Sequence, residues 1–291
     1  MRLLALEEPK RHKVPKRRKT ARFRVFYVIH VLCVLYVLCV ATPLDGKTLT
    51  FQLKQAPSPA PARPFKLPAT SQITLDNGLT IVLVEDHRVP LVTIDAGVPL
   101  APPRAAGAAA LANYVALAES ATELLTEGAG SLTGSELARE VESLGGRIAS
   151  SVNEDYAELS AVVVSENAPR MIEIFADVML RPAFAQSEVA LYKSGRVERL
   201  KVQRQEPAFL VDEMFDKVVY GSHAYSLSAP TPQAVRAVTR PRIERFYKSN
   251  FTPAGSVIVV VGDFDSSSTG KALRKLFEVW KTTGAHHRPV S

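Results

Sequence analysis

Two glutamates, four residues apart, are the first groups in this sequence whose type and spacing could do chemistry. Glu119 and Glu123 lie in the apolar stretch ALAESATELLTEGAG, residues 116–130. Residues four apart sit about one turn apart on the same face of an α-helix, so the two carboxylates should project together. Such a pair could catalyse proton transfer, hold a cation, or form the solvent-exposed edge of a core helix.

The other residues with catalytic potential are scattered. No H-x-x-E-H or H-E-x-x-H motif occurs, and no serine stands in a G-x-S-x-G turn. Both cysteines, Cys33 and Cys39, lie in one apolar run near the N-terminus, so the rest of the chain has no thiol for a disulfide, a nucleophile or a metal. We expect His87 in an exposed turn and His223 packed in a loop. The six histidines are His12, His30, His87, His223, His286 and His287.

The net charge of +7 is concentrated in an N-terminal tail. Residues 1–24 contain ten Lys or Arg and two Glu, while the remainder has 26 basic and 27 acidic residues. The body of the protein is therefore nearly neutral and shows no basic stripe with interleaved aromatics. This distribution argues against nucleic-acid binding.

An uncharged apolar run, residues 25–44, follows the basic tail. Its length and its basic flank predict an uncleaved membrane anchor, and small residues near its end leave a cleaved signal peptide open. Because the positive charge precedes the run, the tail should stay cytoplasmic and the body should be exported, for example to the periplasm. Residues 45–69 are proline-rich and predict a stiff linker, and residues 285–291 form a polar tail.

Residues 70–284 should form the folded domain. Asp76-Asn77-Gly78 is a turn signal between two apolar runs, and a third run spans 91–98. A hairpin should turn at Asn153-Glu154-Asp155, and the fully apolar run 256–264 should be a central strand.

Helices are expected between these strands. A capping box of Thr133 and Glu136 should open one of them, and Gly145-Gly146 should end it. Strands followed by helices, a hairpin, more helices and a late strand predict an α+β fold with helices on one face of a mostly antiparallel sheet. The other expected helices cover 102–128, 167–181, 186–204, 211–221, two short segments in 231–251, and 266–280 with a serine or threonine cap.

The order of these segments resembles the N-terminal half of pitrilysin/insulinase-type zinc peptidases, which include mitochondrial processing peptidase subunits. The resemblance is carried from about residue 65 to residue 283 by pieces such as TLDNGLTIVLVEDHRVPLVTI, ELLTEGAG, SELAREVESLGGRIASSVNEDYAELS and FYKSNFTPAGSVIVVVGDF. It implies one half of a two-half metallopeptidase architecture.

The family's inverted zinc motif, H-x-x-E-H, is absent at the matching positions. Aligned through LLTEG, the two histidine positions fall on Glu119 and Glu123, and the catalytic glutamate position falls on Thr122. The distal glutamate ligand falls on Arg199, beside Glu198. A second register places Asn113 at the first histidine position.

The resemblance therefore implies zinc for the family but no zinc ligands, no catalytic residues and no cofactor here. We expect one of the two carboxylates to be solvated and the other to pair with Arg199. A hard cation held by Glu119, Glu123 and Glu198 is the alternative.

Three functions remain open. The leading expectation is a catalytically inactive homologue that pairs with an active peptidase subunit or a second half-domain, or that binds an extended peptide. The second is an active zinc metalloendopeptidase subunit, with a carboxylate-based site or completed by another chain. The third is a truncated gene product.

Overall fold

The structure, a computed structural model, describes the following residues: 32, 69–103 and 107–281. The chain divides into two compact units, residues 1–64 and 65–291, and the elements below belong to the second. The expected tail, anchor and nearly all of the linker lie outside the described residues, as does the polar tail. These segment boundaries stay predictions.

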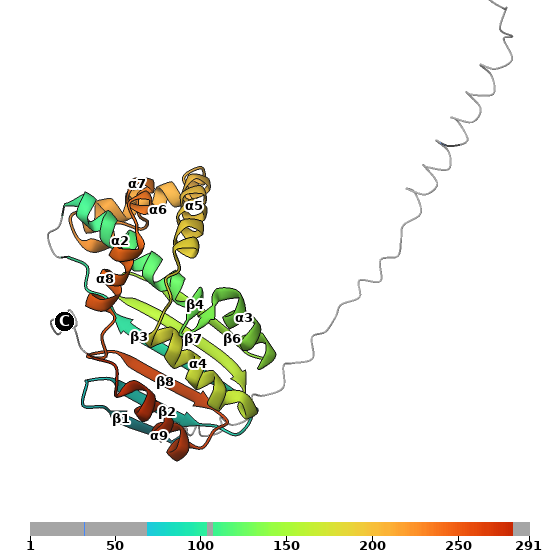
Figure 1. The fold of residues 1–291 in the computed structure, drawn as a ribbon. Coiled ribbons are helices and arrows are strands. Elements are labelled where there is room, and N and C mark those ends of the chain that lie inside the picture. The colour runs from blue at the N-terminus through green and yellow to red at the C-terminus, as the bar shows by residue number, and fades with distance from the viewer. Residues whose placement is uncertain (1–31, 33–68, 104–106, 282–291) are drawn as a thin grey trace, which may run out of the picture. The chain divides into compact units, whose positions relative to one another are not determined.

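A six-stranded sheet is the centre of the second unit, in the order β1-β2-β8-β3-β7-β6 (Figure 1). Every neighbouring pair is antiparallel except β2 with β8, so the expected α+β fold with a mostly antiparallel sheet is confirmed. The strands are β1 Thr70–Thr74, β2 Thr80–Glu85, β3 Leu91–Pro99, β6 Arg147–Val152, β7 Tyr156–Val164 and β8 Val257–Gly262. Two short strands, β4 Gly128–Ala129 and β5 Leu132–Thr133, pair separately.

The last strand in the sequence, β8, occupies the middle of the sheet. It lies between β2 and β3, as its uninterrupted apolar sequence predicted. The turn from β1 to β2 is the predicted one: Gly78 has a φ of +90°, which glycine adopts readily. Asn77 in this turn donates to the carbonyls of Phe277 and Trp280, at 2.8 and 3.0 Å, and so ties the turn to the end of the chain's last described helix.

One face of the sheet carries the core. Along β3 and β7 buried and more exposed residues alternate, because successive side chains of a strand point to opposite faces. The helices α4 (Ala168–Leu180) and α9 (Ser266–Phe277) cover the buried face, α4 against β7 and α9 against β2 (Figure 1).

The remaining helices gather mostly at one end of the sheet (Figure 1). Among them α2 packs against α7, α8 and the edge strand β6, and α5 packs against α7. They are α2 Ala108–Glu123, α3 Gly134–Ser143, α5 Gln186–Gln203, α6 Pro207–Tyr220, α7 Pro232–Arg236 and α8 Arg240–Asn250.

The helix ends confirm some predictions and correct others. The capping box of Thr133 and Glu136 opens α3 as expected. The cap of α9 is not a serine or threonine but Asp265, whose carboxylate accepts from the backbone N–H of Ser268 at 2.7 Å. Helix α6 begins four residues earlier than predicted, at Pro207, because proline is well suited to a helix's first turn.

Within residues 69–103 and 107–281, no helix is both long and apolar enough to cross a bilayer. The apolar run 25–44, on which the anchor prediction rests, lies outside the described residues apart from residue 32.

Candidate functional site

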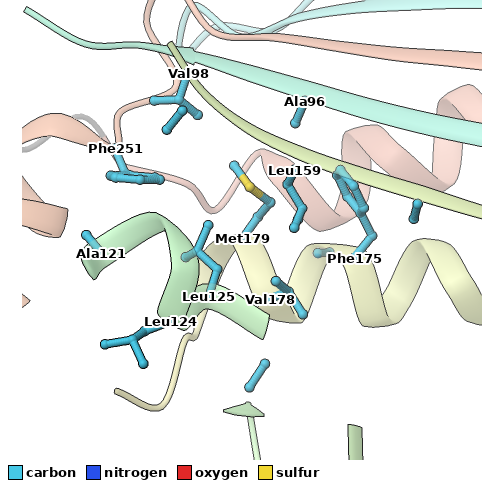
Figure 2. Close-up of a cluster of buried hydrophobic side chains, with 14 of the residues drawn as sticks. Ala96, Val98, Ala121, Leu124, Leu125, Leu159, Phe175, Val178, Met179 and Phe251 are labelled. Atoms are coloured by element: carbon cyan, nitrogen blue, oxygen red, sulfur yellow. The ribbon is translucent and has the colours of Figure 1, made fainter. Parts of the chain in front are cut away.

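The end of α2 is fixed in the core. Ala116 and Ala121 are fully buried, and their small side chains let neighbouring elements approach the helix closely. Just after α2, Leu124 and Leu125 enter the cluster that also contains Met179 of α4, and Figure 2 shows these side chains together. The backbone that carries Glu119 and Glu123 is therefore held in place by packing.

Helix α5 presents a polar face to this end of α2. Tyr192, Arg196, Arg199 and Gln203 recur at intervals of four, three and four residues, which places them along one side of the helix. Glu198 lies on the opposite side, where it pairs with Lys201 at 2.7 Å. The hard-cation alternative is therefore wrong: Glu119 and Glu123 are bound by Arg196 and Arg199, and Glu198 does not join them in any metal-holding group among the described residues.

The inner ion pair joins Glu119 to Arg196. The guanidinium donates from Nε to Oε2 at 2.8 Å and from Nη2 to Oε1 at 2.9 Å, which is a bidentate arrangement. Only 9% of the arginine side chain and 14% of the glutamate side chain are exposed. Nη1 also donates to Oε1 of Gln203 at 3.1 Å. Burial lowers the pKa of Arg196, but the hydrogen bonds and charge of Glu119 outweigh it and raise that pKa.

The outer ion pair joins Glu123 to Arg199. Nη2 of the arginine donates to Oε2 of the glutamate at 3.0 Å, with 54% and 41% of the two side chains exposed. Burial raises the pKa of the Glu123 carboxyl, and the neighbouring Arg199 opposes that rise. This pair lies at the solvent edge, whereas the Glu119–Arg196 pair lies between the helices.

Two buried hydroxyls accompany these pairs. Thr122 Oγ1 and Tyr192 Oη have no hydrogen-bond partner among the described residues. Burial, reinforced by the charges of Glu119 and Glu123, raises the pKa of Tyr192. Thr122, the position that the resemblance aligns with the family's catalytic glutamate, is fully buried and carries a hydroxyl, which is no general base.

The residues present do not fit a catalytic zinc ion. Zinc sites of this class need imidazole nitrogens, and the matching positions carry carboxylates that are already bound by guanidinium groups. Two fixed positive charges also stand where a cation would have to sit. In the part of the chain that the structure describes, no group of three or more His, Cys, Asp or Glu side chains is arranged to hold a metal.

The prediction for the two carboxylates was half correct. Glu123 pairs with Arg199 as expected, but Glu119 is not solvated, because Arg196 reaches it. Arg196 was missed, although its spacing of three residues from Arg199 puts the two arginines on one face of a helix, as the spacing of four does for the two glutamates. Asn113, the alternative first position, donates to the carbonyl of Ala109 in its own helix at 2.9 Å.

The two histidines of the domain lie outside this cluster. His87 is exposed in the turn after β2, as predicted, and also bridges Asp263 and Glu85 at 2.6 and 2.8 Å. His223 stacks edge-on against Tyr225, with ring centres 4.5 Å apart, in the loop after α6.

A small cavity of about 80 Å³ opens beside Glu119, between α2 and the turn that joins β6 to β7. Its walls include Leu111 and Tyr114 of α2, and Asn153 of the turn. Strand β6 lies next to it and is an edge strand, paired only with β7 among the described strands. Its outer backbone groups are thus not used by another strand of the sheet.

Comparison with known proteins agrees with this fold. The model of the insulinase family, peptidase family M16, matches residues 91–232. An uncharacterised zinc protease of Streptomyces coelicolor is 23% identical over 158 residues, which are 53% of this chain and 34% of that protein. The chain therefore spans about a third of the length of such curated relatives.

Solved structures share the architecture. The peptidase M16 inactive domain from Pseudomonas fluorescens superposes with a TM-score of 0.68 at 20% identity, covering 76% of this chain and 53% of that one. The periplasmic protease PqqL of Escherichia coli gives 0.66 at 16% identity, covering 76% and 25%. The family match over residues 91–232, together with the element order and the position of α2 in it, shows that this part of the chain is similar to a peptidase M16 (insulinase) family domain.

Proposed function

We propose that this protein is a catalytically inactive M16 homologue that binds an extended peptide or a partner peptidase instead of cleaving peptides itself. The observation that carries the proposal is the pairing of Glu119 with Arg196 and of Glu123 with Arg199. The two positions that would hold zinc are committed to ion pairs, and the position of the base is a buried threonine.

In this proposal the two ion pairs hold α2 and α5 together, which is the structural role that a bound metal ion would have. They join α2 to α5 across 77 and 76 residues of sequence. A metal ion would link the same two helices through its ligands. The bidentate Glu119–Arg196 contact therefore fixes the spacing of the helices while contributing no Lewis acid and no activated water.

The edge strand β6 supports peptide binding. An extended peptide can add to a free sheet edge through backbone hydrogen bonds, with pockets for alternate side chains. Such a peptide would run past the cavity beside Glu119, and that cavity has room for one small side chain.

The partner and the location extend the proposal. M16 domains occur in longer chains, and this chain covers about half of the Pseudomonas fluorescens structure. The partner we propose is an active homologous subunit or a second half-domain. We further propose an exported, periplasmic domain (70–284), tethered through the apolar run 25–44 and the linker 45–69, with PqqL as a periplasmic neighbour in fold.

Zinc analysis and peptide cleavage by the purified full chain test inactivity. We expect well under one equivalent of zinc and no chelator-sensitive cleavage. The triple variant Glu119→His, Thr122→Glu, Glu123→His, combined with Arg199→Glu, rebuilds the family's ligands and should gain zinc. About one zinc per unmodified chain, together with chelator-sensitive cleavage, would overturn the proposal.

Peptide binding is tested separately with a labelled extended peptide and fluorescence anisotropy. A copy of the same peptide that is N-methylated at alternate backbone nitrogens is the matched control, because it keeps the side chains and loses the donors needed for strand addition. We expect the methylated copy to bind at least about tenfold more weakly. Equal binding of both copies would contradict addition to β6.

A further inference from the structure

Three separate segments line the cavity beside Glu119. The first is α2 and the second is the turn that joins β6 to β7. The third follows α6 and contributes Ala224, Leu227 and Ser228. It belongs to residues 207–228, which comprise α6 and η3 Ala224–Ser226, one turn of 3₁₀-helix. We call residues 207–228 the α6 flap, and its position decides how far the cavity is closed.

The α6 flap is held together internally. The hydroxyl of Ser228 donates to Asp216 of α6 at 2.6 Å, which ties the end of the segment back to the helix. Tyr220 at the end of α6 meets Tyr225 edge-on, with ring centres 5.6 Å apart. His223 packs on the other side of these contacts, 4.5 Å from the Tyr225 ring centre. Helix and turn should therefore move as one piece.

The middle of the α6 flap is weakly attached to the rest of the domain. None of the fourteen residues of α6 is buried, and apolar side chains such as Met214 and Val218 are 70% and 76% exposed. The partly buried apolar residues Phe209 and Leu227, which pack against the core, lie near the two ends of the segment. Because burial of apolar surface is what resists local opening, the middle of the flap can lift at low cost while its ends stay anchored.

One surface hydrogen bond joins the α6 flap to the opposite wall of the cavity. Oη of Tyr225 donates to Oδ1 of Asp155, in the turn between β6 and β7, at 2.7 Å. Within the part of the chain that the structure describes, no other hydrogen bond or ion pair connects the flap with α2 or with that turn. Closure of the cavity on this side therefore depends on a single polar contact.

The acceptor of this bond is firmly placed. The backbone carbonyl of Asp155 accepts from the N–H of Leu100 at 2.6 Å. The side chain of Asn153 accepts from the backbone N–H groups of Asp155 and Tyr156, at 2.9 and 2.8 Å. The turn between β6 and β7 is thus the fixed side of the contact, and the α6 flap is the side that can move.

We propose that the α6 flap is a lid over the cavity beside Glu119 and that the Tyr225–Asp155 hydrogen bond is its latch. With the latch closed, the cavity has a volume of about 80 Å³ and takes only a small side chain. Lifting the flap removes one wall and admits a larger one. A single hydrogen bond biases an equilibrium by roughly threefold to tenfold, so loss of the latch should shift the lid toward the open state by that factor.

Thiol labelling of the full chain in a mild detergent tests the lid without any ligand. Cys33 and Cys39 are replaced by serine, and Ala118→Cys places one thiol in the cavity wall, at a position only 4% exposed. Tyr225→Phe removes the latch and should speed labelling by about threefold to tenfold. Tyr156→Phe is the matched control, because this tyrosine is exposed in the same turn and its hydroxyl bonds to none of the described residues. It should leave the rate unchanged.

The acceptor gives an independent check. Asp155→Ala should speed labelling as much as Tyr225→Phe, Asp155→Asn should keep it slow because an amide oxygen still accepts, and the two fast substitutions together should add nothing. Equal labelling rates with and without the latch overturn the proposal. So does a faster rate that is matched by an equal fall in the urea midpoint, because the thiol would then be reached by unfolding of the whole domain.

The consequence for ligands rests on the proposed peptide binding and is measured separately by fluorescence anisotropy. Two labelled peptides that differ only in an alanine or a phenylalanine at one position are compared. Tyr225→Phe should narrow the preference for the alanine peptide by at least about threefold. An unchanged preference overturns the role of the latch in selection. Failure of both peptides to bind would contradict the proposed function, while the labelling rates would still decide whether the lid exists.

Discussion

Two ionic clusters in this domain use similar groups in opposite surroundings. Between α2 and α5, Glu119 and Arg196 pair with 14% and 9% of their side chains exposed. At the ends of β2 and β8, His87 bridges Asp263 and Glu85, with 61%, 31% and 37% exposed. Both clusters join segments far apart in the sequence, but only the first is shielded from water.

The difference decides how much each cluster contributes to the fold. A buried charge that loses its partner is left in a medium of low dielectric constant, and this costs several kcal/mol. An exposed group that loses its partner is solvated by water instead. Single substitutions in the α2–α5 cluster should therefore lower the free energy of unfolding markedly. The contribution of the His87 cluster should be visible mainly as a dependence of stability on pH.

The largest effect is expected from Glu119→Ala. It leaves the Arg196 guanidinium buried with only Gln203 as a partner, so the free energy of unfolding should fall by about 3 kcal/mol. Urea unfolding of the full chain, followed by the fluorescence of its one tryptophan, measures this directly, because Trp280 is 7% exposed in the fold.

Glu198→Ala is the matched control, since Glu198 is an exposed glutamate on the opposite side of α5. It should shift the urea midpoint only slightly. Equal losses for Glu119→Ala and Glu198→Ala would show that burial of the inner pair does not matter, and the comparison between the clusters would fail.

The second prediction removes the inner pair completely. Glu119→Leu combined with Arg196→Met replaces both charges by apolar groups of similar size, so neither is left unpaired. Because replacing a buried ion pair in this way is often neutral or stabilising, the double variant should recover most of the stability lost in Glu119→Ala. A double variant as unstable as the single one would indicate that the pair supplies shape or specificity that apolar packing cannot.

Much of the fold follows from local signals in the sequence. The Asp76-Asn77-Gly78 turn, the capping box at Thr133 and the apolar run of β8 each specify one element with little help from the rest of the chain. Position along the chain also predicts that the family's zinc motif, absent from this sequence, would stand on α2. These features depend on spacing and residue type, which are visible without coordinates.

The side-chain environment of α5 and α6 does not follow in the same way. Arg196 is buried although arginine is normally exposed, and α6 turns its apolar side outward. Both outcomes depend on how each helix is rotated against its neighbours, and one residue changes that rotation by about 100°. The pattern in the sequence predicts the helices but not which face of each helix packs against the rest of the domain.

The third prediction concerns the outer pair. Glu123→Gln should change the free energy of unfolding by less than about 0.5 kcal/mol, because exposed pairs contribute little. Burial raises the pKa of Glu123 in the fold, so its charged form carries a small penalty that the amide removes. The same urea titration measures the effect, and a loss comparable to that of Glu119→Ala would place both pairs in one buried network.

The smallest effect is expected at His87, and it should appear as a slope against pH. Hydrogen bonds that the His87 ring donates to Asp263 and Glu85 raise the pKa of His87. The pKa of the Glu85 carboxyl is lowered chiefly by hydrogen bonds from Ser266 and then by the one from His87. The hydrogen bond from His87 also lowers the pKa of the Asp263 carboxyl. A raised histidine pKa adds stability that is complete below the unfolded value near 6.5 and is lost as the pH rises through the folded value. The carboxyls add stability that is lost as the pH falls through their own lowered values.

The cluster should therefore stabilise the fold most in mildly acidic solution, about pH 5 to 6, between the titration of the carboxyls and that of the histidine. His87→Gln should flatten the fall in melting temperature between pH 6 and pH 8. Arg88→Gln is the control: its partner Asp86 has its pKa lowered to about 2 by the hydrogen bond from Arg88, so neither group titrates in that range. An unchanged slope in His87→Gln would show that water screens the bridge completely. In that case the α2–α5 cluster would contribute to the stability of the fold and the His87 cluster would not.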